Sequence, residues 1–127
     1  MKERGATLYF AVIIMSILMA AVFSLSSLVL VQIQTIKSMG NSIIAYYAAD
    51  TGAERVLDDL YQSIFDDDGE YDSVDLDNGS SYKVWITQPV GGALPNIPTS
   101  GACNAQYYCI KSVGTYNNTR RAVEVSG

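Results

Sequence analysis

The residue types that could carry chemistry are few in this chain, and its two cysteines are the most informative. Cys103 and Cys109 lie six residues apart. In an exported protein such a pair is typical of one disulfide bond that closes a short loop, whereas in the cytosol it would indicate two free thiols or half of a metal site. The compartment decides between these interpretations, and the membrane segment of this chain favours the disulfide.

Carboxylates form the second group, and eleven of the 13 acidic residues lie between Asp50 and Asp77. The run FDDDGEYDSVDLDNGSS is most simply a solvated, flexible acidic loop. Oxygen ligands at alternating positions also suit calcium, and Asp66, Asp68 and Asp72 could supply them. Their spacing is not that of the helix-loop-helix calcium site, and its bidentate glutamate is missing. We therefore expect no cofactor. If the acidic run binds one after all, calcium is the candidate.

The side chains on which most catalytic sites depend are missing. The chain has no histidine, so general bases, activated nucleophiles and metal sites built around imidazole cannot form. Its net charge is −5, and only Arg120 and Arg121 adjoin one another among the cations, which argues against a nucleic-acid surface. We expect neither an enzyme nor a nucleic-acid-binding protein.

The elements that position these residues begin with a long uncharged segment. The run from Gly5 to Ile36 is roughly 30 residues, and roughly 20 suffice to cross a bilayer as a helix. A secretory signal peptide does not explain it, because the apolar core of such a signal is only about 7 to 15 residues long. Lys2 and Arg4 precede the run, and positive charge stays in the cytoplasm. The sequence predicts a single-pass protein of the inner (cytoplasmic) membrane, with its N-terminus inside.

The helical pattern continues beyond the membrane segment. Apolar residues recur every three or four positions as far as Ile64, and no proline interrupts them. We expect a transmembrane helix over residues 6–36 that continues as an amphipathic helix over residues 37–65. Unbroken, such a helix would be roughly 90 Å long at 1.5 Å per residue, which is longer than the core of a small domain requires.

The remaining residues, 66–127, predict a small β domain. Strands are expected at Tyr82–Thr87, Tyr107–Val113 and Arg120–Val125, and the three prolines between residues 88 and 102 predict a loop. Three or four antiparallel strands laid against the outer half of the helix would bury the apolar faces of both. The expected fold class is α+β, with a long N-terminal helix packed on a small antiparallel sheet. The sheet edges and the proline loop are the expected contact surfaces.

The N-terminal sequence MKERGATLYFAVIIMSILMAAVF resembles the start of type IV prepilins, in which a short basic leader ends in glycine before a small residue and a long apolar helix. In that family a membrane peptidase cuts after the glycine and methylates the new N-terminus. Carried onto this chain, the leader is residues 1–5 and the cut falls between Gly5 and Ala6. Removing the leader charges is physically reasonable, because an unpaired charge inside a filament core is costly.

A second stretch, IIAYYAADTGAERVLDDL, is similar to the alanine-rich, acidic outer half of the helix in the PilX-like group of minor pilins. One position departs from the family pattern. Most type IV pilins have a glutamate at the fifth mature position, which pairs with the N-terminal amine of a neighbouring subunit. Here that position is Phe10, and no acidic residue occurs between Glu3 and Asp50. In the family, subunits without this glutamate tend to be minor, tip or initiation subunits.

The resemblance implies a structural subunit, a minor pilin, of a type IV pilus-like surface filament. The implied partners are other pilin subunits through the N-terminal helix, prepilin peptidase, an inner-membrane assembly platform and, before assembly, the lipid bilayer. Two alternatives stay open. A pseudopilin of a type II secretion or DNA-uptake machine shares the fold and the leader, and an uncleaved, single-span anchored extracytoplasmic domain would keep Met1 instead of beginning at Ala6.

Overall fold

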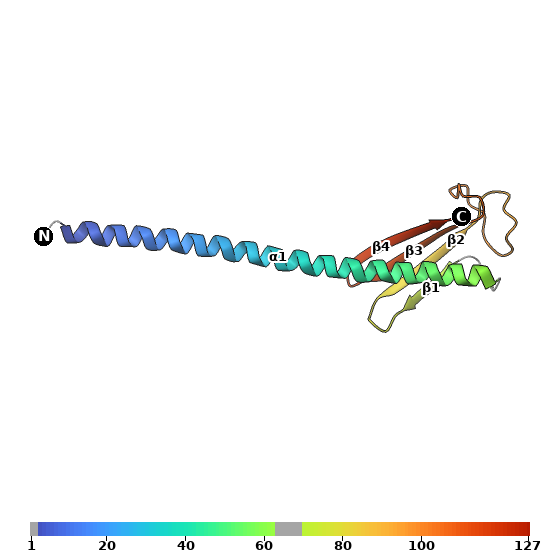
Figure 1. Cartoon of the computed structure of the whole chain (residues 1–127), viewed down its shortest axis with the longest axis horizontal. Helices are drawn as coiled ribbons and strands as arrows, with labels where there is room; N and C mark the ends of the chain where they lie inside the picture. The colour runs from blue at the N-terminus through green and yellow to red at the C-terminus, as the bar shows by residue number, and fades with distance from the viewer. Residues whose placement is uncertain (1–2, 63–69) are drawn as a thin grey trace. The chain divides into compact units, whose positions relative to one another are not determined.

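The computed structural model describes residues 3–62 and 70–127 and follows the expected order of a helix before a sheet. Helix α1 (Glu3–Gln62) is followed by the strands β1 (Glu70–Asp75), β2 (Ser81–Thr87), β3 (Cys109–Tyr116) and β4 (Thr119–Ser126) (Figure 1). The chain divides into two compact units, Met1–Lys37 and Ser38–Gly127.

The first half of α1 contains almost exclusively apolar residues and no proline, a composition that permits an uninterrupted helix. Within the described residues, α1 is long and apolar enough to span a membrane or to act as a signal, on the basis of length and composition.

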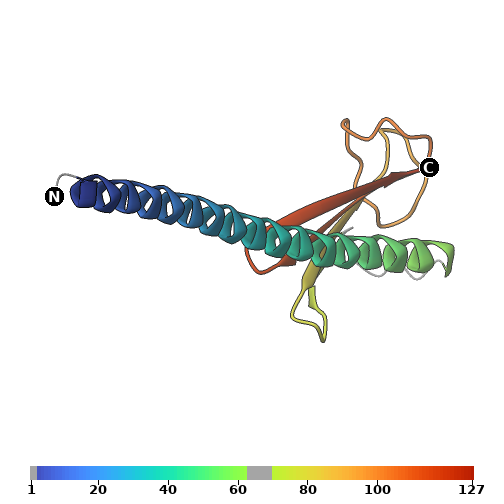
Figure 2. The ribbon, with the colours of Figure 1, turned by 60° about the vertical axis from the view of Figure 1, so that its left-hand side comes forward.

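The four strands form one antiparallel sheet in the order β1-β2-β3-β4, so each strand pairs with its neighbour in sequence (Figure 2). The β3–β4 hairpin turns through Asn117 and Asn118, and Asn117 has a φ of 50°, a conformation that asparagine tolerates better than most residues. The β1–β2 connection includes Gly79, with a φ of 77°.

The second half of α1 packs on one face of the sheet (Figures 1 and 2). Small side chains recur along its buried side because they let the helix approach the strands closely. The buried residues of this helix–sheet core are Ala45, Ala48, Ala49, Ala53 and Val56 of α1 with Tyr82, Val84, Ile86 and Ile110 of the sheet. A Cβ atom on Gly114 of β3 would overlap the backbone of Ala45. The alanine-rich pattern of the sequence therefore has a packing role.

The α+β architecture with a long N-terminal helix packed on an antiparallel sheet is confirmed. The expected strands correspond to β2, β3 and β4, with shifts of up to three residues at their ends. The acidic loop prediction is wrong for Glu70–Asp75, which forms β1 and pairs with β2. Tyr71 and Val74 pack against the core from this strand, so apolar contacts outweigh the low strand propensity of aspartate.

Candidate functional site

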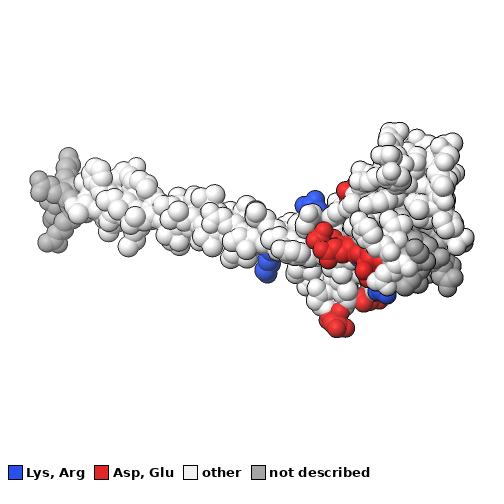
Figure 3. Space-filling view, turned by 45° about the vertical axis from the view of Figure 1, so that its right-hand side comes forward, with Lys and Arg blue, Asp and Glu red and all other residues white. Residues whose placement is uncertain are grey.

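The most extensive surface that requires a partner is the apolar first half of α1. Its large side chains are exposed along the whole unit, for example Leu18 at 60% and Phe23 at 67%. On the visible face, Figure 3 shows no charged side chain between the grey end of the helix and the first blue side chain. An apolar surface of this extent is not stable in water, so lipid or another apolar surface must cover it.

Serine and threonine hydroxyl groups in this half of α1 are compatible with contact to lipid or to another apolar surface. Ser24 Oγ donates to Ala20 O at 2.9 Å, and Ser26 Oγ donates to Val22 O at 3.0 Å. Ser16 and Thr35 bond backbone carbonyls in the same way. Because each of these hydroxyls is paired inside its own helix, it can enter a bilayer or a helix bundle without leaving an unsatisfied donor.

The residues of the expected cleavage site both lie in α1. A Cβ atom on Gly5 would meet nothing within 4 Å, so packing within this chain does not require glycine there. Glycine nevertheless destabilises a helix by about 1 kcal/mol relative to alanine. Ala6 is exposed beside it.

The structure places an exposed aromatic ring at the position where pilins usually have glutamate. Phe10 is 63% exposed, and its ring meets that of Tyr9 edge to face, with 6.4 Å between the centroids. A phenylalanine side chain has no charge, so it cannot neutralise a neighbouring amine, and its burial does not bury a charge. Any surface that covers Phe10 would therefore meet an apolar side chain.

The side of α1 that faces away from the sheet remains uncovered in the second unit. Ile43 and Tyr47 are 55% and 64% exposed, and Tyr61 is 82% exposed. Glu54 and Asp58 are exposed between them at helical spacing. Figure 3 shows acidic side chains gathered on the surface of this unit. This face combines apolar anchors with carboxylates.

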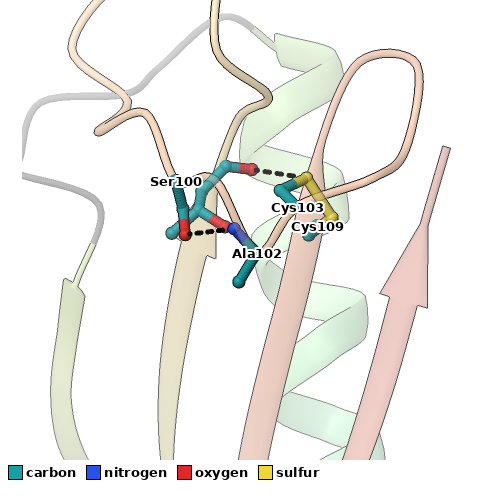
Figure 4. The surroundings of a disulfide bond; sticks show 5 residues. Ser100, Ala102, Cys103 and Cys109 are labelled. Atoms are coloured by element: carbon teal, nitrogen blue, oxygen red, sulfur yellow. Dashed lines mark hydrogen bonds between the residues drawn. A yellow bond between two sulfur atoms is a disulfide. The ribbon is translucent and has the colours of Figure 1, made fainter.

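The expected disulfide is present between Cys103 and Cys109, with 5.7 Å between their Cα atoms (Figure 4). Cys109 is the first residue of β3 and pairs with Thr87 of β2 and Ser126 of β4. Cys103 is buried and lies 3.9 Å from the carbonyl oxygen of Thr87. The bond therefore attaches the loop before β3 to the end of the sheet.

The proline loop depends on one buried side chain that the sequence analysis did not identify. Gln88 Nε2 donates to Leu94 O at 3.0 Å and to Ile97 O at 2.7 Å, while its Oε1 accepts from the Leu94 N–H at 2.9 Å. Its backbone N–H donates to Pro98 O, and its carbonyl accepts from the Ser100 N–H. In the sequence, the only signal for this role was the position of a glutamine directly before a Pro/Gly-rich segment.

The outer face of the sheet, opposite α1, carries paired charges around the single tryptophan. Lys83 forms an ion pair with Glu70 and lies 5.3 Å from the ring centroid of Trp85. Across β3 and β4, Lys111 Nζ lies 3.3 Å from Glu124 Oε1. A groove of about 550 Å³ runs beside Trp85 under the disulfide loop. These contacts were also not predicted from the sequence.

The candidate calcium ligands cannot be placed. Asp66 and Asp68 lie outside the described residues, and so does the side chain of Asp72. Elsewhere in residues 3–62 and 70–127, no three histidine, cysteine or acidic side chains are grouped so that they could hold a metal ion.

Comparison with known proteins gives no further assignment. No protein-family profile matches this chain, and neither a curated protein nor a solved structure does.

Proposed function

We propose that this protein is a minor subunit of a type IV pilus-like surface filament. It would be inserted in the inner membrane as a single span with its N-terminus in the cytoplasm. Prepilin peptidase would cleave it between Gly5 and Ala6, and an assembly platform would then move it from the bilayer into the filament. Helix–helix contacts would replace lipid contacts, and the β domain would lie outside.

The observation that carries this proposal is that one helix serves two environments. The first half of α1 exposes apolar side chains, with four of its hydroxyls paired internally, and the second half buries an alanine-rich side against the sheet. A membrane anchor needs only about 20 residues and no rigid connection to its domain. A helix that continues from the apolar segment into the domain is what a pilin-like subunit requires and a simple anchor does not.

Gly5 supports the cleavage step. It lies in a helix that it weakens, and packing within the chain does not require it. A requirement from outside the chain, such as a peptidase site that admits only a small residue, would explain its presence.

Phe10 supports the minor role. A subunit that polymerises through a charge pair at this position needs a carboxylate, and Phe10 has none. A subunit at the tip or the initiating end has no neighbour on one side, so the charge pair can be lost there.

The test is the N-terminus and mass of the chain recovered from the membrane and from sheared surface material. We expect a chain that begins at Ala6, with an added methyl group, and a fraction of it in the sheared material. A chain that retains Met1 and occurs only in the membrane would instead establish an anchored domain.

A matched pair of variants separates cleavage from helix stability. Gly5→Leu should block the removal of residues 1–5, whereas Gly40→Leu should not, although neither glycine has an atom within 4 Å of its Cβ position. Normal processing of Gly5→Leu would contradict the assigned site. Co-purification of the chain with a secretion machine, without surface filaments, would favour a pseudopilin.

A further inference from the structure

Strand β4 forms one edge of the sheet, and half of its backbone groups face away from the sheet. Tyr108 and Gly127 exchange two backbone hydrogen bonds, each of 3.2 Å, where the β3–β4 ladder continues beyond the two strands. In an antiparallel ladder, pairs that exchange hydrogen bonds alternate with pairs whose N–H and C=O groups point outward. The register of β3 with β4 therefore assigns the outward groups to Arg120, Ala122, Glu124 and Ser126.

The two edges of the sheet differ in how well they could accept another strand. At the β1 edge the register shifts between Tyr71 and Val74, and the strand has acidic residues at both ends, Glu70 and Asp75. Bulges and charges are features that prevent pairing at a sheet edge. Strand β4 keeps a continuous register with β3 over its 8 residues and contains no proline. Strand β4 is therefore the edge that is open to pairing.

The groove beside Trp85 extends to this open edge. It has a volume of about 550 Å³ and crosses the outer face of the sheet from β2 to β4. The strand residues that line it are Trp85, Thr87, Cys109, Lys111, Glu124 and Ser126. Glu124 and Ser126 thus belong both to the groove and to the outward backbone of β4. Because directly opposite residues of paired strands have their side chains on the same face, a strand added to β4 would place side chains beside the groove.

The other end of β4 carries a cation that could select this strand. Arg120 is exposed and forms no ion pair with the residues that the structure describes. Its neighbour Arg121 is engaged with α1, since Arg121 Nη2 donates to Ser42 Oγ at 3.0 Å. Opposite charges on directly paired residues stabilise a sheet, so a carboxylate opposite Arg120 would be favourable.

A second copy of this chain does not suit the edge. Two identical strands that pair in antiparallel fashion are related by a two-fold axis perpendicular to the sheet, which reverses every direction in its plane. The second half of α1 packs on one face of the sheet, so the helices of two such copies would run in opposite directions (Figures 1 and 2). Copies that insert into one membrane in the same orientation run in the same direction. The partner strand must therefore come from a different protein.

We propose that β4 accepts an extended, antiparallel strand of another protein. This strand has a large apolar side chain opposite Ser126, where it enters the groove beside Trp85, and a carboxylate opposite Arg120. Val123 and Val125 lie half-buried on the helix side of β4 and favour apolar residues opposite them. Main-chain hydrogen bonds supply the affinity of such a contact, and side-chain sites along the edge supply its specificity. The contact lies within the second unit and goes beyond the proposed function, which does not depend on it.

The test uses the full chain in detergent and a defined strand fused through a flexible linker to a soluble carrier protein. The strand alternates valine with threonine over about nine residues, with tyrosine opposite Ser126 and glutamate opposite Arg120. Hydrogen exchange at the Ala122 and Glu124 amides should slow about tenfold or more when the strand is added, because these N–H groups gain acceptors. Exchange within β1 should not change.

Two variants of β4 separate the backbone contact from the charge contact. Ala122→Pro removes an outward N–H but no β3–β4 hydrogen bond, so it should abolish binding of the strand, whereas Ala122→Val should retain it. Arg120→Glu should weaken binding about tenfold or more, and a strand with lysine in place of its glutamate should restore it. Lys37→Glu makes the same change in net charge outside the sheet and should alter binding less than twofold.

Three results would overturn the proposal. The first is unchanged exchange at Ala122 and Glu124 when the strand is present in excess. The second is equal binding of the strand to wild-type and Arg120→Glu chains. The third is protection of these amides in the chain alone that rises with its concentration, since a second copy would then occupy the edge. None of these results bears on the proposed function, because the test requires neither cleavage nor filament assembly.

Discussion

Gly52 of α1 faces Ser112 of β3 so closely that a Cβ atom on Gly52 would lie 2.6 Å from Ser112 Oγ. The same Cβ atom would lie 2.7 Å from Tyr82 Cδ2 and 2.8 Å from Val84 Cγ2. Contacts this short do not occur between packed atoms, so the helix and the sheet approach one another here because residue 52 has no side chain. Gly52 therefore sets the separation between the helix and the sheet.

Replacing Gly52 with alanine should destabilise the domain by about 1–3 kcal/mol, as overpacking of a core usually does. Alanine favours the helix over glycine by about 1 kcal/mol, which acts in the opposite direction. This gain does not remove the three close contacts that the new Cβ atom would make with buried side chains. The measurement is thermal unfolding of the full chain in detergent, followed by the fluorescence of Trp85. The control is Gly40→Ala, which has open space and should be neutral or stabilising by up to about 1 kcal/mol.

Ser112 allows an independent test of the same contact. Its Oγ is buried and has no hydrogen-bond partner among the described residues. A buried hydroxyl without a partner costs about 1–3 kcal/mol, so Ser112→Ala should leave the stability unchanged or increase it. The double variant G52A/S112A should be more stable than the sum of the single effects predicts, because the Cβ atom then no longer meets an oxygen. Strict additivity in unfolding experiments would contradict the contact.

The order of helix and strands was predictable because hydrophobic periodicity determines it. The apolar run and the three- or four-residue spacing after it specify α1, and alternation specifies β2. Strand β1 was not predictable in the same way, since Asp72 and Asp75 are poor strand formers. Tertiary contacts stabilise it instead: Tyr71 Oη donates to Asp59 Oδ2 of α1 at 3.0 Å.

Features that depend on one residue type were predictable from the sequence. Contacts between residues that are distant in sequence were not. The short spacing of Cys103 and Cys109, together with the membrane segment that indicates export, predicted the disulfide that the structure contains. The close approach of Gly52 to Ser112 joins elements 60 residues apart in sequence, and no local pattern encodes it. For the same reason Gln88 was missed, because its role depends on the path of the loop that follows.

Removing the disulfide should lower stability moderately. The loop from Cys103 to Cys109 is short, and the loss of chain entropy on closing it corresponds to about 2 kcal/mol. We expect the Cys103→Ser/Cys109→Ser double variant to unfold at a lower temperature, by the shift that corresponds to this loss of stability. The circular dichroism signal of α1 should be unchanged. The wild-type chain treated with a reductant is the control and should match the variant. Equal stability of oxidised and reduced wild-type chains would show that the bond does not stabilise the fold.

Replacing Gln88 should release the proline loop. Gln88→Ala leaves the carbonyls of Leu94 and Ile97 without their side-chain donor and should cost about 1–3 kcal/mol. Hydrogen exchange at the Leu94 amide is the direct readout, because this N–H donates to Gln88 Oε1. Its protection should fall in the variant, while the protection of amides within β3 should change much less. Unaltered exchange at Leu94 would argue that the backbone bonds of residue 88 suffice to hold the loop.

The ion pair between Lys83 and Glu70 should make the stability of the β1–β2 pairing depend on pH in the acidic range. The Lys83 ammonium group, through its hydrogen bond and its charge, holds the pKa of Glu70 below its ordinary value of 4.5. A lowered carboxyl pKa contributes stability above the ordinary value, and this contribution is lost as the pH falls through the pKa of the folded state. β1 should therefore loosen only at a pH below 4.5, and less so in 1 M salt, where the pair is already screened.

The measurement for this pair is an NMR titration of the Glu70 side chain in the full chain. Lys83→Met removes the ammonium group, so the pKa of Glu70 should rise towards its ordinary value. Lys111→Met is the matched control, because Lys111 pairs with Glu124 between β3 and β4 on the same face of the sheet, and it should leave Glu70 unchanged. The Glu70 side chain is 48% exposed, so we expect the loss of the ion pair to change its titration and to change the global stability little. An identical Glu70 titration with and without Lys83 would mean that the two side chains do not pair in solution.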